Sequence, residues 1–142
     1  MERQGPFWDA IEGRVDLPPA TSTLGFELIA VDPDAGTIEV RFLAADSFLN
    51  PVGVIQGGFL AAMLDETLGP ALIATLGPDQ FAPTADLHIQ FLRPAKPGRL
   101  IGRGRVVRKG RDLGFMSGEL VDESGEVVAV ATATATIRDF KR

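Results

Sequence analysis

The longest hydrophobic run of the chain covers residues 57–76, where nearly every position is apolar or small. Asp65, Glu66 and Thr67 interrupt the run near its centre. The run is too long and too continuous for one strand and therefore predicts a helix that is apolar around most of its surface. Such a helix either crosses a membrane or is surrounded by protein, and two adjacent acids near its centre argue against lipid. We predict a buried central helix that kinks or ends near Pro70.

Six further segments have the composition or the alternation of apolar and polar positions that is typical of β-strands. They are residues 25–31, 37–42, 84–92, 100–109, 113–122 and 127–138. A Pro/Asp/Gly turn at residues 32–36 predicts that the first two form a hairpin, whereas residues 43–56 show no clear period and predict a loop. The order of elements favours an α+β domain in which a curled antiparallel sheet wraps around one long central helix.

The alternation also predicts which side chains face that helix. In the last strand, the face with small side chains consists of Ala129, Ala131, Ala133 and Ala135, and the other face of Val130, Thr132, Thr134 and Thr136. A ladder of alanines suits the close approach of a helix. In residues 84–92, the predicted core face consists of Ala85, Leu87, Ile89 and Phe91, and the opposite face of Thr84, Asp86, His88 and Gln90.

The first 22 residues differ from the rest of the chain, because they are rich in proline and contain one short amphipathic stretch, with Phe7, Trp8 and Ile11 on its apolar face. We expect residues 1–22 to form a helical cap and residues 23–142 to form the main domain. A length of 142 residues fits one domain of ordinary size. The start of the chain lacks the basic and then apolar pattern of a secretory signal, so we expect a cytoplasmic location.

Composition narrows the chemistry. The chain has no cysteine and one histidine, His88, which excludes disulfides, thiolate nucleophiles and paired-histidine metal sites. A net charge of −5 has the wrong sign for a protein that neutralises nucleic-acid phosphates. We expect no metal, no cofactor, no nucleic acid and no membrane among its partners, and we interpret His88 as an ordinary surface or interface residue.

Asp65 is the strongest candidate for a catalytic group, because an acid on an apolar helix is costly unless it is solvated, hydrogen-bonded or used. On the helical wheel it shares a side with small residues, namely Gly58, Ala61, Ala62 and Gly69. At the start of the same helix, the free backbone N–H groups of Gly57 and Gly58 could stabilise an oxyanion. The neighbouring Glu66 points elsewhere, and we interpret it as structural or interfacial.

Seven residues separate Gly58 from Asp65, a rise of roughly 10 Å along one helix. Both ends therefore cannot contact one reacting carbonyl group within a single subunit. If two subunits place their helices antiparallel about a two-fold axis, the glycine end of one helix can meet Asp65 of the other. We predict an active site at the interface of a homodimer.

Two segments carry a resemblance to a known family. Residues 50–58 read NPVGVIQGG and are followed by Asp65, and residues 84–95 read TADLHIQFLRPA. Together they resemble the signatures of hotdog-fold acyl-CoA thioesterases of the phenylacetate-degradation type, and the likeness covers roughly residues 24–137. The resemblance implies a hotdog fold, hydrolysis of an acyl-CoA thioester, and a homodimer or a homotetramer built as a dimer of dimers.

The resemblance also implies residue roles. Asp65 takes the place of the catalytic carboxylate, and Gly57 and Gly58 the place of the amides that polarise the thioester. Three residues are implied around them: Asn50 orients substrate or water, Gln56 stands where many members carry histidine, and Thr84 lies near the catalytic water. Glutamine can donate a hydrogen bond but cannot shuttle a proton near neutral pH.

The phosphates of coenzyme A require local cations in an acidic protein. The resemblance points to a group at strand ends and in one turn, consisting of Arg93, Arg108, Lys109, Gly110 and Arg111. An ordinary solvated hairpin end is an equal alternative for residues 108–111.

Several alternatives stay open at this stage. The residues do not decide whether Asp65 is a nucleophile or a general base. A non-catalytic protein that binds or senses acyl-CoA on the same fold is the main alternative function. A hydratase is less well supported, because His88 lies on the wrong element for a catalytic histidine.

Overall fold

The computed structural model describes residues 3–140 of the chain. Three helices and one short 3₁₀ turn are formed by α1 (Pro6–Ile11), α2 (Pro19–Thr23), η1 (Asp46–Phe48) and α3 (Gly57–Ile73). The strands are β1 (Glu27–Asp32), β2 (Thr37–Ala44), β3 (Gln80–Phe81), β4 (Thr84–Phe91), β5 (Gly98–Lys109), β6 (Leu113–Val121), β7 (Val127–Thr136) and β8 (Arg138–Asp139). All six predicted strands and the central helix are present, whereas α2, β3 and β8 were not predicted.

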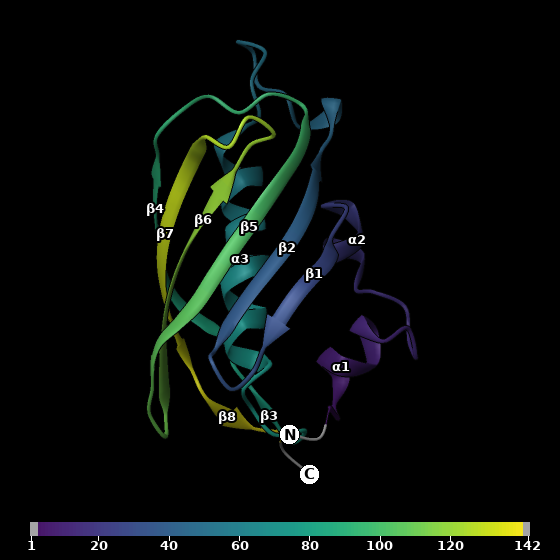
Figure 1. The fold of residues 1–142 in the computed structure, drawn as a ribbon, viewed down its shortest axis with the longest axis vertical. Coiled ribbons are helices and arrows are strands. Elements are labelled where there is room, and N and C mark those ends of the chain that lie inside the picture. The colour runs from purple at the N-terminus through teal and green to yellow at the C-terminus, as the bar shows by residue number, and fades with distance from the viewer. Residues whose placement is uncertain (1–2, 141–142) are drawn as a thin grey trace.

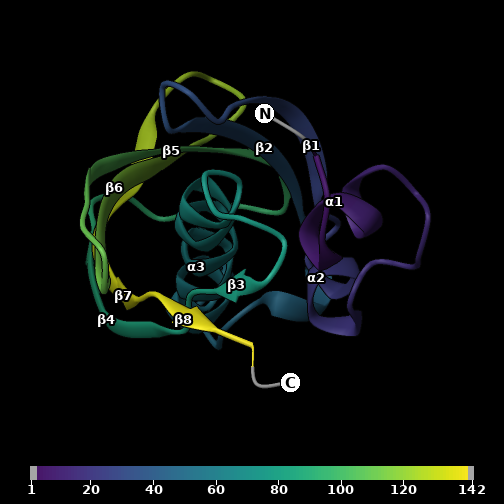
Figure 2. The same ribbon diagram turned by 90° about the horizontal axis from the view of Figure 1, so that it is seen from below.

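The six long strands form one sheet in the order β1-β2-β5-β6-β7-β4, in which all neighbours are antiparallel. The sheet curves around α3 and encloses it on one side, as the view along the helix in Figure 2 makes clear, while Figure 1 shows the strands crossing in front of it. The predicted α+β architecture, a curled antiparallel sheet wrapped around one helix, is confirmed. The short strands β3 and β8 pair with each other in a separate two-stranded sheet.

The helix α3 begins at Gly57 and continues through Pro70 to Ile73, three residues short of the predicted end. Its sheet-facing side is fully buried and includes Met63, Leu64, Leu68 and Leu72. The predicted alanine ladder of β7 is confirmed. Ala129, Ala131, Ala133 and Ala135 are all buried on the face of the sheet that α3 covers. A helix can lie this close only where the sheet has small side chains.

Glycines in β5 and β6 also allow the helix to lie close to the sheet. The four that lie under the helix are Gly102, Gly104, Gly114 and Gly118. A Cβ atom at Gly114 would lie 2.5 Å from a methyl carbon of Leu72, and one at Gly104 would lie 3.2 Å from a methyl carbon of Leu68. Real Cβ atoms essentially never approach as closely as the first distance and rarely as closely as the second, so these glycines help to fix the spacing between the helix and the sheet.

At the start of β4 the predicted facing of Thr84 and Ala85 is wrong. Thr84 pairs with Ala135 and Asp86 pairs with Thr134, so Ala85 is an extra residue in a β-bulge. Because the bulge shifts the alternation by one position, Thr84 lies on the helix side of the sheet rather than on the opposite side. Farther along the strand Leu87 packs against the core as predicted.

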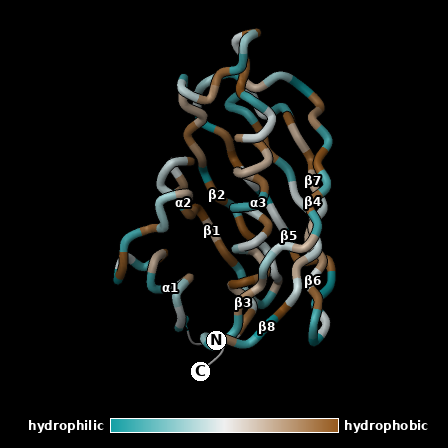
Figure 3. The backbone as a smooth tube through the Cα atoms, turned by 180° about the vertical axis from the view of Figure 1, so that it is seen from behind, coloured by the Kyte–Doolittle hydropathy of each residue, from teal (hydrophilic) through white to brown (hydrophobic). Residues whose placement is uncertain are grey.

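The N-terminal segment lies against the other edge of the molecule from β4. Figure 2 shows α1 and α2 beside β1, and the view from behind in Figure 3 shows α3 between α2 on one side and β4 on the other. Trp8 is only 2% exposed, and the Arg3 guanidinium lies over its ring at 4.7 Å. This segment contains the helices α1 and α2, and α2 spans the boundary that was expected after residue 22. None of the helices within residues 3–140 has the length and apolar character needed to cross a membrane.

Candidate active site

Asp65 lies on the side of α3 that the sheet does not cover, and its side chain is exposed in the single chain. The hydroxyl of Thr84 donates a hydrogen bond of 2.9 Å to the Oδ1 atom of Asp65. The bulge at Ala85 makes this bond possible, because it turns Thr84 toward the helix. One carboxylate oxygen is thereby held, and the other is left for a water molecule or a substrate.

The predicted small-residue side of α3 is present around Asp65. Gly58 is exposed, while Ala61, Ala62 and Gly69 are half-buried. These small side chains leave the helix backbone close to the surface on both sides of the carboxylate. A second chain or an extended ligand could therefore lie close to the helix backbone along this side.

The start of α3 presents two free amide groups. The backbone oxygen of Gln56 accepts from Phe59 at 3.0 Å, but within residues 3–140 no group accepts from the N–H of Gly57 or Gly58. The Gln56 side chain is exposed and makes no capping hydrogen bond. Two unpaired donors at the positive end of a helix dipole form a suitable place for developing negative charge.

The loop before the helix is organised by Asn50. Its side-chain oxygen accepts from the backbone N–H groups of Val52 at 3.1 Å and Val54 at 3.2 Å. The backbone N–H of Asn50 also donates to the Val54 oxygen at 2.8 Å. The carboxamide oxygen is therefore used within the loop, and the amide nitrogen is the part of this side chain that could face a ligand.

Glu66, the next residue after Asp65, has a different environment. It is half-buried, and Thr21 of α2 donates a hydrogen bond of 2.9 Å to its Oε1 atom. Burial raises the pKa of Glu66, the hydrogen bond from Thr21 opposes that change, and the nearby charge of Asp65 adds to it. These contacts agree with a structural rather than a catalytic role for Glu66.

The basic residues expected to hold coenzyme A do not come together within one chain. Arg93 lies before β5 and forms an ion pair of 3.1 Å with Glu126, whereas residues 108–111 lie at the other end of β5. Lys109 donates to the backbone oxygen of Thr75 at 3.0 Å. Arg108, Gly110 and Arg111 are exposed at that turn.

Two aromatic contacts at the start of α3 were not predicted. The ring of Phe91 lies 3.2 Å from the point where a Cβ atom of Gly57 would be, and 54% of Phe91 is exposed. Phe48 and Phe59 stack with ring centres 4.0 Å apart. The alternation of β4 assigned Phe91 to the core, and no local signal in the sequence pairs it with a glycine 34 positions earlier.

The described residues, 3–140, contain no group of three His, Asp or Glu side chains that could hold a metal ion. The groups that the site presents are the carboxylate of Asp65, the hydroxyl of Thr84 and the backbone amides of Gly57 and Gly58. Together these groups supply an acid–base or nucleophilic centre and a place for an oxyanion. Within one chain they lie at two separate positions along α3.

Comparison with known proteins defines the class. Residues 52–129 match the family model of the thioesterase superfamily, which is more than half of the chain. The crystal structure of a phenylacetic acid degradation-related protein from Ralstonia eutropha JMP134 is 43% identical, with a TM-score of 0.88 over 92% of this chain and 98% of that one. Human acyl-coenzyme A thioesterase 13 is 25% identical over 107 residues, which cover 72% of this chain and 74% of that protein.

A further solved structure is informative because of its ligand. The protein smu.793 from Streptococcus mutans UA159 was crystallised with acetyl CoA. It is 25% identical to this chain, with a TM-score of 0.73 over 82% of this chain and 91% of that one.

The curled sheet around α3 and these similarities define a hotdog-fold thioester hydrolase. The chain belongs to the thioesterase superfamily, and its relatives include thioesterases related to phenylacetic acid degradation. The resemblance read from residues 50–58 and 84–95 is thus confirmed.

Proposed function

We propose that this protein hydrolyses an acyl-CoA thioester to the free acid and CoA. The observation that carries the proposal is the exposed Asp65, held by Thr84 on the side of α3 that also carries the free amides of Gly57 and Gly58. The name of the human relative and the acetyl CoA in the Streptococcus mutans structure support acyl-CoA as the substrate class.

The proposed chemistry assigns one task to each group. The amides of Gly57 and Gly58 bind the thioester oxygen, on which charge develops as the carbonyl carbon becomes tetrahedral. With Asp65 as a general base, its free oxygen takes a proton from water, the hydroxide adds to the carbonyl carbon and the C–S bond breaks. The departing thiolate then takes up the proton and leaves as free CoA.

With Asp65 as a nucleophile, the carboxylate itself attacks and expels CoA, and water then hydrolyses the resulting anhydride. Single-turnover hydrolysis in ¹⁸O-water separates the two routes. In the nucleophilic route, water that attacks the Asp65 carbon of the anhydride leaves the label in the Asp65 carboxylate within that turnover, while the general-base route leaves it only in the acid product.

The distance along α3 supports a site shared by two subunits. Gly58 and Asp65 of one helix are roughly 10 Å apart and cannot both contact one carbonyl group. β4 is an edge strand of the described sheet, and an antiparallel copy of β4 beside it would bring two α3 helices together head to tail. In this homodimer, Asp65 of one subunit acts beside Gly57 and Gly58 of its partner, and a dimer of dimers would repeat the arrangement.

The basic residues are proposed to bind the phosphates of CoA from such an assembly. Arg93 lies at one end of the sheet, and Arg108, Lys109, Gly110 and Arg111 lie at the other. An antiparallel dimer places opposite ends of two sheets near each other, so groups that are separate within one chain can serve one nucleotide. The cation of Lys109 is already anchored by Thr75.

Subunit complementation tests the proposal directly. Gly58→Val adds a side chain where no other atom lies within 4 Å, so the fold should tolerate it while the amides become blocked. Asp65→Asn and Gly58→Val should each abolish release of thiol from acyl-CoA substrates. Co-expression of the two should restore about a quarter of wild-type activity, because half of the dimers then contain one intact shared site.

The controls separate failure of the assembly from failure of the function. Light scattering establishes the oligomer, and circular dichroism establishes that each variant is folded. Loss of activity that co-expression does not restore would contradict the shared site. Full activity of Asp65→Asn would contradict the mechanism, and tight binding of acyl-CoA without thiol release would favour the alternative of a non-catalytic acyl-CoA-binding protein.

A further inference from the structure

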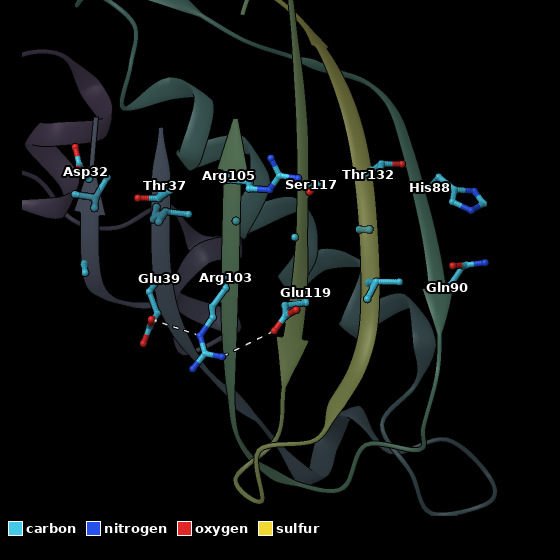
Figure 4. A pocket seen from close by; sticks show the side chains of 17 residues that line it. Asp32, Thr37, Glu39, His88, Gln90, Arg103, Arg105, Ser117, Glu119 and Thr132 are labelled. Carbon is cyan, nitrogen blue, oxygen red and sulfur yellow. Dashed lines mark ion pairs between the residues drawn. The ribbon is translucent and has the colours of Figure 1, made fainter. Parts of the chain in front are cut away.

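The face of the sheet that points away from α3, here called the outer face, contains a hollow of about 770 Å³. Its wall is formed by two rows of side chains that cross all six strands in register. The Arg105 row consists of Asp32, Thr37, Arg105, Ser117, Thr132 and His88, and the Arg103 row of Ala30, Glu39, Arg103, Glu119, Val130 and Gln90. Figure 4 shows both rows.

In the Arg103 row, the one cation is paired with two carboxylates of the same row. The Nε atom of Arg103 lies 3.5 Å from Glu39, and its Nη1 atom lies 3.9 Å from Glu119. The single positive charge of this guanidinium is offset by two carboxylates, and the two dashed lines in Figure 4 mark these ion pairs. This row therefore gives the hollow a structured wall and a slight excess of negative charge.

In the Arg105 row, by contrast, the guanidinium is available to a ligand. Arg105 has no ion pair and no acceptor for its guanidinium within the part of the chain that the structure describes. The acid in its row, Asp32, is occupied by its own turn, because its Oδ1 atom accepts from the backbone N–H groups of Asp34 and Ala35 at 3.0 Å each. Five planar N–H donors thus remain free in the middle of the hollow.

Hydroxyl groups surround this free guanidinium. Thr37 on β2 and Ser117 on β6 are the direct cross-strand partners of Arg105, at the short distance that neighbouring side chains on one sheet face have. Figure 4 shows the Arg105 side chain extending across the face toward Ser117. Thr132 comes next in the row, so a guanidinium and three hydroxyl groups form a line of hydrogen-bond donors.

We propose that this hollow binds a small organic carboxylate, with its carboxylate group on Arg105. A guanidinium binds a carboxylate through two parallel hydrogen bonds, and Thr37 and Ser117 can donate to the remaining lone pairs. A volume of about 770 Å³ leaves room for an organic body beyond the carboxylate, along Thr132 and Val130.

The charges of the hollow define the ligand further. Three carboxylates, those of Asp32, Glu39 and Glu119, face the two guanidiniums of Arg103 and Arg105. The excess of one carboxylate opposes every anion, so a ligand with a single negative charge on Arg105 is opposed less than a dianion. The site lies on the opposite face of the sheet from α3 and Asp65, so it is distinct from the proposed active site and does not depend on it.

Titration with benzoate, followed by ¹H–¹⁵N NMR on the intact oligomer, tests the proposal. The amides of Ser117 and Thr132 should shift in a saturable way, and neutral benzamide should produce no such shifts. Arg105→Gln should weaken benzoate binding by about tenfold or more, because it removes a charge-assisted hydrogen-bond pair. Inorganic phosphate, largely a dianion above neutral pH, should bind more weakly than benzoate.

Arg41→Gln is the matched control. Arg41 lies on β2 and pairs with Glu27 at 3.1 Å, so the variant has the same change in net charge but leaves the hollow intact. Benzoate binding should be unchanged in this variant. The proposal is overturned if Arg105→Gln binds benzoate as well as the wild type does, if the shifts occur only around Gly58 and Asp65, or if the outer face shows none because a second copy covers it.

Discussion

The two flanks of α3 carry adjacent acids with opposite environments. Asp65 is exposed, faces the open side of the helix and is held by Thr84 from β4. Glu66 is turned by about 100° around the helix, is half-buried beneath α2 and is held by Thr21. Each acid accepts one threonine hydrogen bond of 2.9 Å. The comparison shows that access, rather than the presence of a carboxylate, distinguishes a candidate catalytic group from a structural one.

The largest expected effect compares the two acids directly. Asp65→Asn should lower kcat by on the order of 10²–10⁴-fold, because an amide can neither remove a proton nor attack a thioester. Glu66→Gln should keep kcat within about threefold of wild type, because its side chain does not reach the open flank. Thiol release from a panel of acyl-CoA substrates measures both, and equal losses in the two variants would invalidate the distinction.

Thr84→Val tests how the open flank is organised. Loss of the hydrogen bond to Asp65 should lower kcat by about tenfold, the equivalent of one hydrogen bond to a charged group, with little change in KM. Because both side chains are exposed, the melting temperature should change little. Thr84→Ser retains the hydroxyl and should recover most of the activity; an equally impaired serine variant would argue against the hydrogen bond.

Thr21→Val tests the covered flank with the same chemical change. A half-buried Glu66 without its hydrogen-bond donor should reduce the free energy of unfolding by about 1 kcal/mol. The remaining activity per folded molecule should be unchanged, in contrast to Thr84→Val. Urea unfolding measures the first quantity and thiol release the second, and a catalytic loss without destabilisation would reverse our assignment of the two flanks.

The smallest effect concerns pH. The pKa of Glu66 is raised above its ordinary value of 4.5 in the folded protein, mainly by burial, so folding favours the protonated form. The protonated Glu66 side chain therefore contributes to the free energy of unfolding at low pH. This contribution is lost as the pH rises through the raised pKa and Glu66 ionises. The stability of Glu66→Gln minus that of the wild type should therefore be larger at pH 7.5 than at pH 4. Melting curves of both proteins at the two pH values measure this difference. A constant difference would contradict the raised pKa.

Much of the fold was predictable because it depends on period and on residue size. The apolar run identified α3, and the alanines of β7 identified the strand face beneath it. The small-residue side around Asp65 also follows from helical spacing alone. For the same reason, the separation of Gly58 and Asp65 could be inferred before any coordinates.

The remaining features depend on contacts that local patterns do not encode. The bulge at Ala85 changes the facing of Thr84, although nothing in the alternation of residues 84–92 marks an extra residue. The bond between Thr21 and Glu66 joins residues 45 positions apart. The resemblance grouped Arg93 with residues 108–111, but the length of β5 keeps them at opposite ends of the sheet within one chain.

The glycines beneath α3 have a consequence for mutational screens. Asp65 belongs to the helix and Thr84 to the sheet, so any side chain added at Gly104 or Gly114 that lifts the helix also separates the two partners. A screen that scores turnover alone would rank these glycines with the residues that contact substrate. Parallel measurement of abundance and turnover would distinguish positions that support the reaction through backbone spacing from those that take part in it.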